Sequence, residues 1–314
     1  HHSRGQRARR VIQNFAAVRR HVLTRIPEGG RAVSGVAYIT LSPEGTALFP
    51  AIQAGIEETR LFVHRSAGPG PDAVCFDRVT DLTAEIFPQV AGMIFAAPCG
   101  VVVRAVAGCL RHKSTDPAVV VLDVRARWCV SLVSGHEGGA NDLAVRVANL
   151  VGAEPVITTT TEARKDIIVG IGCRQGTDSG SIIEAVRRGL DLAGVELASV
   201  RLIASADVKA KESGLLDAVR AFGLPLRVLA SEEIRASQRA FTHSDFVRSK
   251  VGLPAVAEPC ALLAGRRTRL LLPKTIINGV TVAVARECFT WSELDPEAHS
   301  TAPAAPNRRS TEPE

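Results

Sequence analysis

The sequence lacks several features that would assign it to a familiar class of protein. None of its seven cysteines forms a Cys-x-x-Cys pair, and neither a His-Glu-x-x-His nor a Gly-x-Ser-x-Gly motif is present. No apolar run reaches the roughly 18–20 residues of a membrane-spanning helix. A structural zinc site, a zinc protease, a serine hydrolase with a nucleophile elbow and a helical membrane protein are therefore not expected.

Acidic residues are scarce at the amino-terminal end, and this scarcity explains the net charge of +6. Residues 1–31 carry eight arginines and one glutamate, so the rest of the chain carries a net charge of −1. A nucleic-acid or membrane arm is one interpretation of such a segment. Because aromatic residues are not interleaved with these arginines, we expect a disordered extension instead, with neither nucleic acid nor a membrane as a partner.

The odd number of cysteines and their mostly apolar surroundings predict free, buried thiols. Free thiols are typical of a reducing compartment, here the cytoplasm. We expect no metal held by the protein's own side chains. The cysteines are Cys75, Cys99, Cys109, Cys129, Cys173, Cys260 and Cys288.

Strand-like and helix-like patterns alternate along residues 36–158 and again from residue 167. They predict two consecutive three-layer α/β domains with mostly parallel or mixed sheets. Strands at 119–123 and 128–133 are expected to form a hairpin, and helices are expected at 179–193, 212–222 and 244–263. The expected divisions are a disordered basic extension (1–32), an amino-terminal domain (33–160), a linker (161–166), a carboxy-terminal domain (167–290) and a disordered tail (291–314).

The most informative stretch is Ser-Gly-His-Glu-Gly-Gly-Ala-Asn at residues 134–141, between an apolar strand and an amphipathic helix. Ligands of α/β sheets bind outside the carboxyl ends of strands. Glycines let the backbone approach a ligand, and a helix start offers N–H groups to an anion. A ligand site that includes Gly135 is therefore expected at this turn.

His136 is the candidate base or acid of this turn, because its ordinary pKa lies near neutral pH. A structural histidine held by hydrogen bonds is the alternative. Gly138, Gly139 and Asn141 are expected to offer N–H groups to a developing oxyanion. Ser134 is not expected to be a nucleophile, because residues two apart at a turn rarely meet.

A second glycine-rich turn follows the apolar strand that begins at residue 167. Gly170 and Gly172 open a Gly-x-Gly-x-x-x-Gly pattern, one residue longer than the dinucleotide fingerprint. An anion-binding turn with Arg174 as a partner fits this pattern better than a nucleotide site. A tight turn without a ligand is the remaining alternative.

Two further pairs of charged residues are candidates for binding. Lys209 and Glu212 are three residues apart and would share one side of a helix start. They could bind a carboxylate and relay a proton, although composition favours an exposed ion pair. Arg104 and Lys113 flank a mostly apolar helix, and Arg104 either faces a ligand or covers apolar surface with its stem.

Several of these segments together resemble the cobalt-precorrin-5A hydrolases of anaerobic cobalamin biosynthesis. The resemblance covers roughly residues 34–287 and rests mainly on the Gly-His-Glu-Gly-Gly-Ala-Asn block at 135–141 and the Gly-Ile-Gly-Cys-Arg block at 170–174. Longer members carry a middle segment between the two domains. Here the threonine run at 158–161 passes almost directly into Ile167, so the chain resembles a compact variant that lacks this segment.

The resemblance implies that water opens a δ-lactone on a cobalt-corrinoid and that a two-carbon unit then leaves as acetaldehyde, giving cobalt-precorrin-5B. His136 would be the base or acid, and Gly138, Gly139 and Asn141 the oxyanion donors. The substrate carries its own cobalt, so no separate cofactor is implied. Contacts to the substrate would come from Gly135, Arg104, Lys113, Gly170, Gly172, Cys173, Arg174, Lys209 and Glu212.

Two alternatives remain at this stage. The chain could be a non-catalytic tetrapyrrole-binding carrier of the same pathway, or a nucleotide-dependent oxidoreductase that uses the second glycine-rich turn. The expected partner is the cobalt-corrinoid substrate. Neighbouring enzymes of the pathway and a second copy of the chain are left open as further partners.

Overall fold

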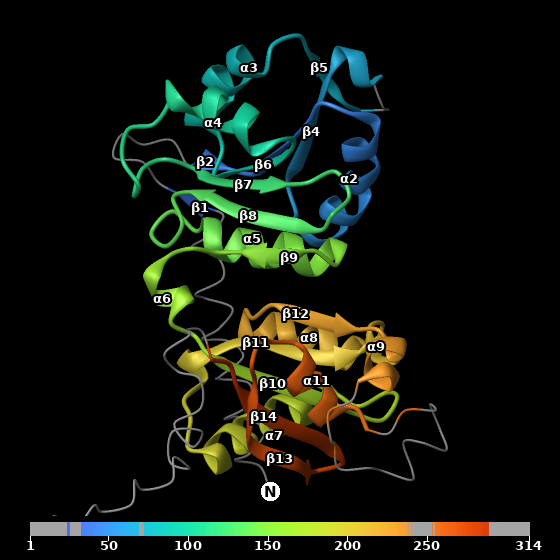
Figure 1. Cartoon of the computed structure of the whole chain (residues 1–314). Helices are drawn as coiled ribbons and strands as arrows, with labels where there is room; N and C mark the ends of the chain where they lie inside the picture. Colours follow the sequence, from blue (N-terminus) through green and yellow to red (C-terminus); the bar gives the residue numbers. More distant parts are fainter. Residues whose placement is uncertain are drawn as a thin grey trace, which may run out of the picture.

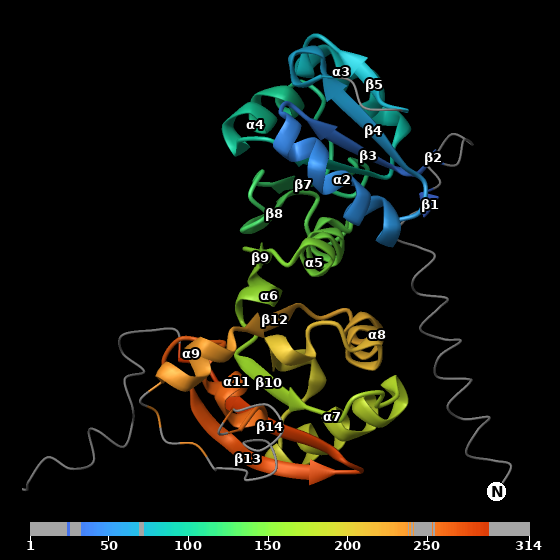
Figure 2. The same ribbon diagram turned by 90° about the vertical axis from the view of Figure 1, so that its right-hand side faces the viewer.

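The computed structural model describes residues 24–25, 33–68, 72–237, 239, 241, 253 and 255–288. Figures 1 and 2 show two α/β units, connected through the short helix α6 (Thr160–Ala163). Each unit has a mixed sheet with helices on both faces, which confirms the predicted three-layer α/β class. Within the described ranges, no helix is long and apolar enough to cross a membrane.

The first sheet has seven strands in the order β5-β4-β3-β6-β7-β8-β9. The strands from β5 to β7 are parallel, β8 is antiparallel to β7, as the hairpin prediction requires, and β9 is parallel to β8. The carboxyl ends of β8 and β9 therefore lie at the amino ends of the other strands. The strands are β3 (Val36–Thr40), β4 (Thr59–His64), β5 (Val74–Phe76), β6 (Gly92–Ala96), β7 (Ala118–Leu122), β8 (Trp128–Val133) and β9 (Glu154–Val156).

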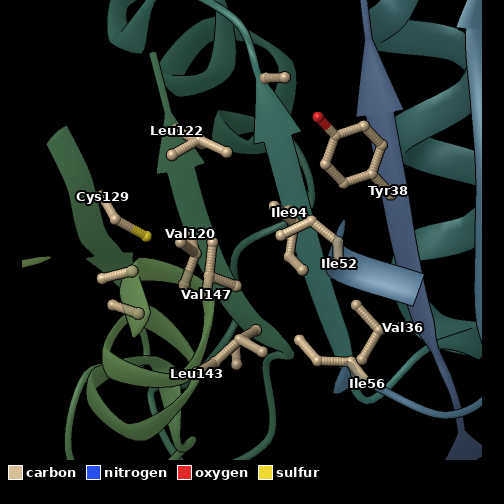
Figure 3. Close-up of a cluster of buried hydrophobic side chains, with 14 of the residues drawn as sticks. Val36, Tyr38, Ile52, Ile56, Ile94, Val120, Leu122, Cys129, Leu143 and Val147 are labelled. Carbon is tan, nitrogen blue, oxygen red and sulfur yellow. The ribbon is translucent and has the colours of Figure 1, made fainter. Parts of the chain in front are cut away.

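Successive side chains of the first sheet's strands point to opposite faces and fill two separate cores. The core under α2 and α5 includes Ile94 and Leu143 (Figure 3), and the core under α3 and α4 includes Phe95 and Val102. Because α5 buries an apolar stripe on the sheet, its position determines where the preceding turn lies. The helices are α2 (Pro43–Gly55), α3 (Val79–Ile86), α4 (Cys99–Ala107) and α5 (Ala140–Val151).

The second sheet has five strands in the order β12-β11-β10-β14-β13. Strands β10, β11 and β12 are parallel, whereas β14 is antiparallel to both β10 and β13. Helices α7 and α8 cover one face, and α9 and α11 cover the other. The elements are β10 (Ile167–Gly172), α7 (Ser179–Ala193), β11 (Val200–Ala206), α8 (Ser213–Phe222), β12 (Leu226–Leu229), α9 (Ser231–Ala236), α11 (Ala257–Leu263), β13 (Arg269–Ile277) and β14 (Val280–Arg286).

The two units meet where α5 approaches the edge strand β12. The Asn149 side chain accepts a hydrogen bond from the Leu226 N–H at 2.9 Å and donates one to the Leu224 carbonyl at 3.0 Å. Its carboxamide thus pairs with the sheet edge as a neighbouring strand would. The second contact, Arg227 with Glu154 at 3.8 Å, joins side chains that are 41% and 45% exposed. Such exposed pairs stabilise proteins little, so Asn149 is the main polar contact of this interface.

Three structural details differ from the sequence predictions. The expected linker at 161–166 overlaps α6, so part of it is helical. Thr24–Arg25 (β1) pairs antiparallel with Val33–Ser34 (β2), although residue 24 falls in the expected disordered extension. Of the helix expected at 244–263, the structure describes α11 alone. The rest of residues 1–32, residues 242–252 and the tail at 291–314 lie outside the described residues.

The prediction about the cysteines is correct in one respect and wrong in another. All seven are free thiols. Cys129 and Cys260 are buried, but Cys75 and Cys99 are exposed, so burial is not general. Cys75 belongs to the short β5 at the sheet edge, and Cys99 is the first residue of α4. An apolar local sequence does not show that a position lies at such an edge.

Replacing Asn149 tests the contact between the two units. Asn149→Ala removes two hydrogen bonds and leaves the Leu226 N–H of β12 and the Leu224 carbonyl before it without their protein partner. We expect a free energy of unfolding lower by about 1–3 kcal/mol, together with faster proteolysis at residues 157–166. Glu154→Gln is the matched control and should change unfolding by less than about 1 kcal/mol. Equal effects of the two changes would contradict the importance of Asn149.

Candidate functional site

The glycine-rich turn (residues 134–141) connects β8 to α5 and lies at the carboxyl ends of β8 and β9. Because β8 is antiparallel to β7, this is the edge where β3, β6 and β7 begin. The turn therefore lies opposite the carboxyl ends of the parallel strands β3 to β7. The loop that enters β7 reaches this edge and contributes Lys113 to it.

Two backbone hydrogen bonds connect the beginning of the turn to the first residues of α5. The Ala140 N–H donates to the Ser134 carbonyl at 3.1 Å, and the Asn141 N–H donates to the Gly135 carbonyl at 2.9 Å. These first amides of α5 are consequently not available to a ligand. The N–H groups of Gly138 and Gly139 make no hydrogen bond to another described residue. Gly138 is half-buried and Gly139 is buried, so a ligand reaches the Gly139 amide only if the turn shifts.

The side chain of Asn141 is buried and holds three segments together. Its Oδ1 accepts a hydrogen bond from Ser131 Oγ at 2.8 Å, and its Nδ2 donates one to Thr159 Oγ1 at 2.9 Å. Asn141 is only 6% exposed. The predicted role of Asn141 as an oxyanion donor is not supported by this geometry, because its carboxamide is already engaged and out of reach. It fixes the start of α5 between β8 and the segment after β9.

His136 and Glu137 occupy the exposed tip of the turn. The His136 ring makes no hydrogen bond to any described residue, whereas Glu137 Oε1 accepts one from Lys113 Nζ at 2.8 Å. This contact holds the pKa of the Glu137 carboxyl below its usual value. The structure therefore brings Lys113 to the turn, as a paired cation next to a histidine that is free to meet a ligand.

The Asp142 carboxylate lies near His136, and the Glu162 carboxylate lies near Asp142. Desolvation and the neighbouring Glu162 carboxylate raise the pKa of Asp142, and His136 opposes that rise. Glu162 in α6 is paired with Lys165 at 2.8 Å. The histidine thus lies close to the Asp142 carboxylate, which belongs to the first turn of α5. Sequence reasoning missed this group because α6 and α5 meet only in the folded chain.

Arg104 does not join this site. Its guanidinium donates to the Gly100 carbonyl, one turn earlier in α4, at 3.0 Å. Helix α4 begins at the carboxyl end of β6, so this contact turns Arg104 toward the opposite edge of the sheet. The predicted substrate contact of Arg104 is not supported for a ligand at the glycine-rich turn.

The first two glycines of the second turn allow a helix to lie directly against the strand. A Cβ at Gly170 would overlap the Ala257 carbonyl of α11, and a Cβ at Gly172 would lie 3.3 Å from Val256 Cβ. Gly170 is buried, so it has no surface for a ligand. This burial does not support its predicted role in substrate binding, and the glycines at this strand permit close helix–sheet packing. A dinucleotide interpretation of this motif loses its physical basis.

Other predicted residues of the second unit do come together, at the carboxyl ends of β10 and β11. Lys209 Nζ lies 3.5 Å from Glu212 Oε1, with the side chains 15% and 16% exposed. Glu212 also accepts a hydrogen bond from the Gly176 N–H at 3.1 Å. Burial raises the pKa of the Cys173 thiol, and nearby Lys209 opposes that rise. The expectation of an exposed ion pair is wrong, because α8 and the second turn cover it. Arg174 is exposed next to this cluster.

The two turns do not form one site. The Asn141–Thr159 hydrogen bond ties the glycine-rich turn to α6, and α6 leads into the amino end of β10 (Figure 1). Cys173 follows the carboxyl end of the same strand. A six-residue strand spans about 20 Å, so the clusters lie at opposite ends of β10. Among the described residues, no group of three or more histidine, cysteine or acidic side chains is arranged to hold a metal ion.

Asn141 offers a test of the structural role assigned to it. Asn141→Ala leaves the hydroxyls of Ser131 and Thr159 without their partner, and we expect the free energy of unfolding to fall by about 1–3 kcal/mol. Asn141→Asp keeps the acceptor for Ser131 and should lose less. Chemical denaturation measures both. An Asn141→Ala protein of unchanged stability would contradict this structural role of Asn141.

The ion pair between Lys209 and Glu212 gives another prediction. Glu212→Gln leaves the Lys209 ammonium mostly buried without its counter-charge, so stability should fall by about 1–3 kcal/mol in denaturant unfolding. Asp217→Asn disrupts an exposed pair with Arg220 in the same helix and should cost less than about 1 kcal/mol. If the two variants unfold alike, the burial of the Lys209–Glu212 pair is energetically irrelevant.

Comparisons with known proteins agree with the division of the chain between two sheets. Residues 81–162 match the family described as cobalamin synthesis G N-terminal, and residues 167–285 match cobalamin synthesis G C-terminus. A Salmonella typhimurium protein named cobalt-precorrin-5A hydrolase is 24% identical over 343 residues, covering 79% of this chain and 97% of that protein. A Priestia megaterium protein of the same name is 43% identical over 90 residues, 29% of this chain and 24% of that one.

A further relative corresponds to part of the chain. Protein CobE of Sinorhizobium sp is 33% identical over 128 residues, which are 40% of this chain and 83% of that protein. The N-terminal and C-terminal family models match successive parts of this chain, and the matched residues together include both glycine-rich turns. The chain belongs to the cobalamin synthesis G family.

Proposed function

We propose that this chain is a cobalt-precorrin-5A hydrolase, which opens the δ-lactone of a cobalt-corrinoid and releases acetaldehyde. The relative that carries this name aligns over 97% of its own length. The observation that carries the proposal is the glycine-rich turn, where an exposed histidine, two amides without a partner among the described residues and a lysine lie together. The free thiols support a reducing, cytoplasmic location.

Lactone opening requires an activated water and a place for negative charge on the carbonyl oxygen. Water adds to the lactone carbonyl, the bond from the acyl carbon to the ring oxygen breaks, and a carboxylate and a free hydroxyl result. The hydroxyl then gives up its proton as the adjacent carbon–carbon bond breaks. Acetaldehyde leaves and the bonding electron pair passes into the conjugated macrocycle. Both steps need a base, and the first needs an oxyanion donor.

The residues of the turn can supply these functions in the proposed reaction. His136 accepts the proton of water and later that of the hydroxyl. The amides of Gly138 and Gly139 donate to the carbonyl oxygen as it gains charge. Lys113 attracts carboxylates of the substrate, with Glu137 holding its ammonium near the turn. Cobalt arrives within the substrate, so the protein itself needs no metal for these steps.

The residues of the second unit take a different part in this proposal. Cys173, Arg174, Lys209 and Glu212 lie at the far end of β10, and they would contact peripheral groups of a corrinoid rather than its lactone. A carrier that binds a tetrapyrrole without chemistry is the second candidate. It is favoured by the CobE relative, most of whose length corresponds to only 40% of this chain.

Acetaldehyde release from cobalt-precorrin-5A distinguishes the two candidates. We expect turnover by the wild-type chain, with oxygen from labelled water entering the new carboxylate. His136→Ala should lower the rate by about 10²–10⁴-fold, because proton transfer loses its base. His64→Ala, at the opposite edge of the same sheet, is the control and should leave the rate unchanged. Binding of the corrinoid by wild type without acetaldehyde release would favour the carrier.

A further inference from the structure

Ser134 is the one residue of the glycine-rich turn whose polar side chain is buried without a hydrogen bond. It is 7% exposed, and its Oγ has no partner among the described residues. Most buried hydroxyls in proteins are paired, so an orphan of this kind requires an explanation. Ser131, three residues earlier in β8, is the ordinary case, because its hydroxyl donates to Asn141.

The backbone of Ser134 is also unusual. Its φ is +62°, a left-handed conformation that costs an L-residue energy and that glycine adopts freely. A glycine would therefore fit this position better than serine, because glycine adopts a positive φ without strain and has no hydroxyl that needs a hydrogen-bond partner. Strain and an unpaired polar group at one residue, at the end of a strand and before a helix, are typical of functional positions.

The surroundings of Ser134 indicate what its hydroxyl serves. Gly138 packs directly on it, since a Cβ at Gly138 would overlap Ser134 Cβ. The backbone of Gly138, whose amide is one of the two proposed oxyanion donors, thus packs against the side chain that carries this hydroxyl. Three of the five residues from 135 to 139 are glycine, which lets the turn shift with little steric hindrance.

We propose that Ser134 is a catalytic residue whose hydroxyl donates a hydrogen bond to the lactone carbonyl oxygen, taking the part expected of Asn141. In the free protein the glycine-rich turn covers this hydroxyl, and the turn shifts when the substrate binds. The hydroxyl then joins the Gly138 and Gly139 amides around the developing oxyanion. No covalent bond to Ser134 forms. This assignment rests on the proposed lactone-opening function.

Substituting Ser134 separates this role from a structural one. Ser134→Ala removes the unpaired hydroxyl, and Ser134→Gly also relieves the positive φ. We expect both variants to have an unchanged or higher Tm, while kcat for acetaldehyde release falls about 10²–10³-fold and KM changes little. Ser131→Ala is the matched control, and its Tm should fall because that hydroxyl is paired.

The possible results distinguish failure of this assignment from failure of the proposed function. If wild type releases acetaldehyde and Ser134→Ala does so at the same rate, the Ser134 role is wrong and the function stands. A lower Tm of Ser134→Ala would make the residue structural and overturn the assignment. An acyl adduct on Ser134 in acid-quenched wild-type reactions, detected by mass spectrometry, would replace the donor with a nucleophile. If the wild-type protein releases no acetaldehyde, the proposed function itself is contradicted, whatever the role of Ser134.

Discussion

The hydrogen bonds of the Asn141 carboxamide are the constraint on which the candidate site depends. They join the end of β8 through Ser131, the start of α5, and the segment after β9 through Thr159. These three segments are adjacent only because β8 reverses direction relative to β7 and β9 then runs parallel to it. With the start of α5 held in this way, the backbone between Gly135 and Gly139 can form a tight turn that keeps His136 at the surface.

The glycines of the two motifs serve different physical purposes. At Gly170 the missing side chain allows α11 to lie directly on β10, so this residue belongs to the packing of the second unit. At Gly138 the missing side chain allows the turn to cover Ser134, which is a polar and strained residue. The first arrangement stabilises the fold, whereas the second is kept despite its cost. This contrast is the reason why the proposed chemistry is assigned to the first unit and the proposed peripheral contacts to the second.

Much of the architecture could be predicted from local pattern. The alternation of apolar strands with amphipathic helices indicated two α/β units, and the hairpin expected from strands at 119–123 and 128–133 is present. Other properties could not be predicted. Lys209 and Glu212 looked like an exposed pair, because their burial depends on α8 and on Gly176, which is more than thirty positions away. Likewise, no feature of the sequence near Asn141 predicts that its side-chain amide will donate a hydrogen bond to Thr159.

The amino-acid order was therefore sufficient to place a histidine and three glycines between a strand and a helix, because a period of two residues and one of 3.6 residues are local properties. It was also sufficient to indicate the family, since both motifs stand intact in the chain. The edge of the sheet on which the turn lies, the engagement of Asn141, the covering of Gly170 and the isolation of the Ser134 hydroxyl depended on the folded chain. Strand direction and hydrogen-bond pairing join residues distant in sequence, and the partners of a buried polar group are known only when every neighbouring segment is in place.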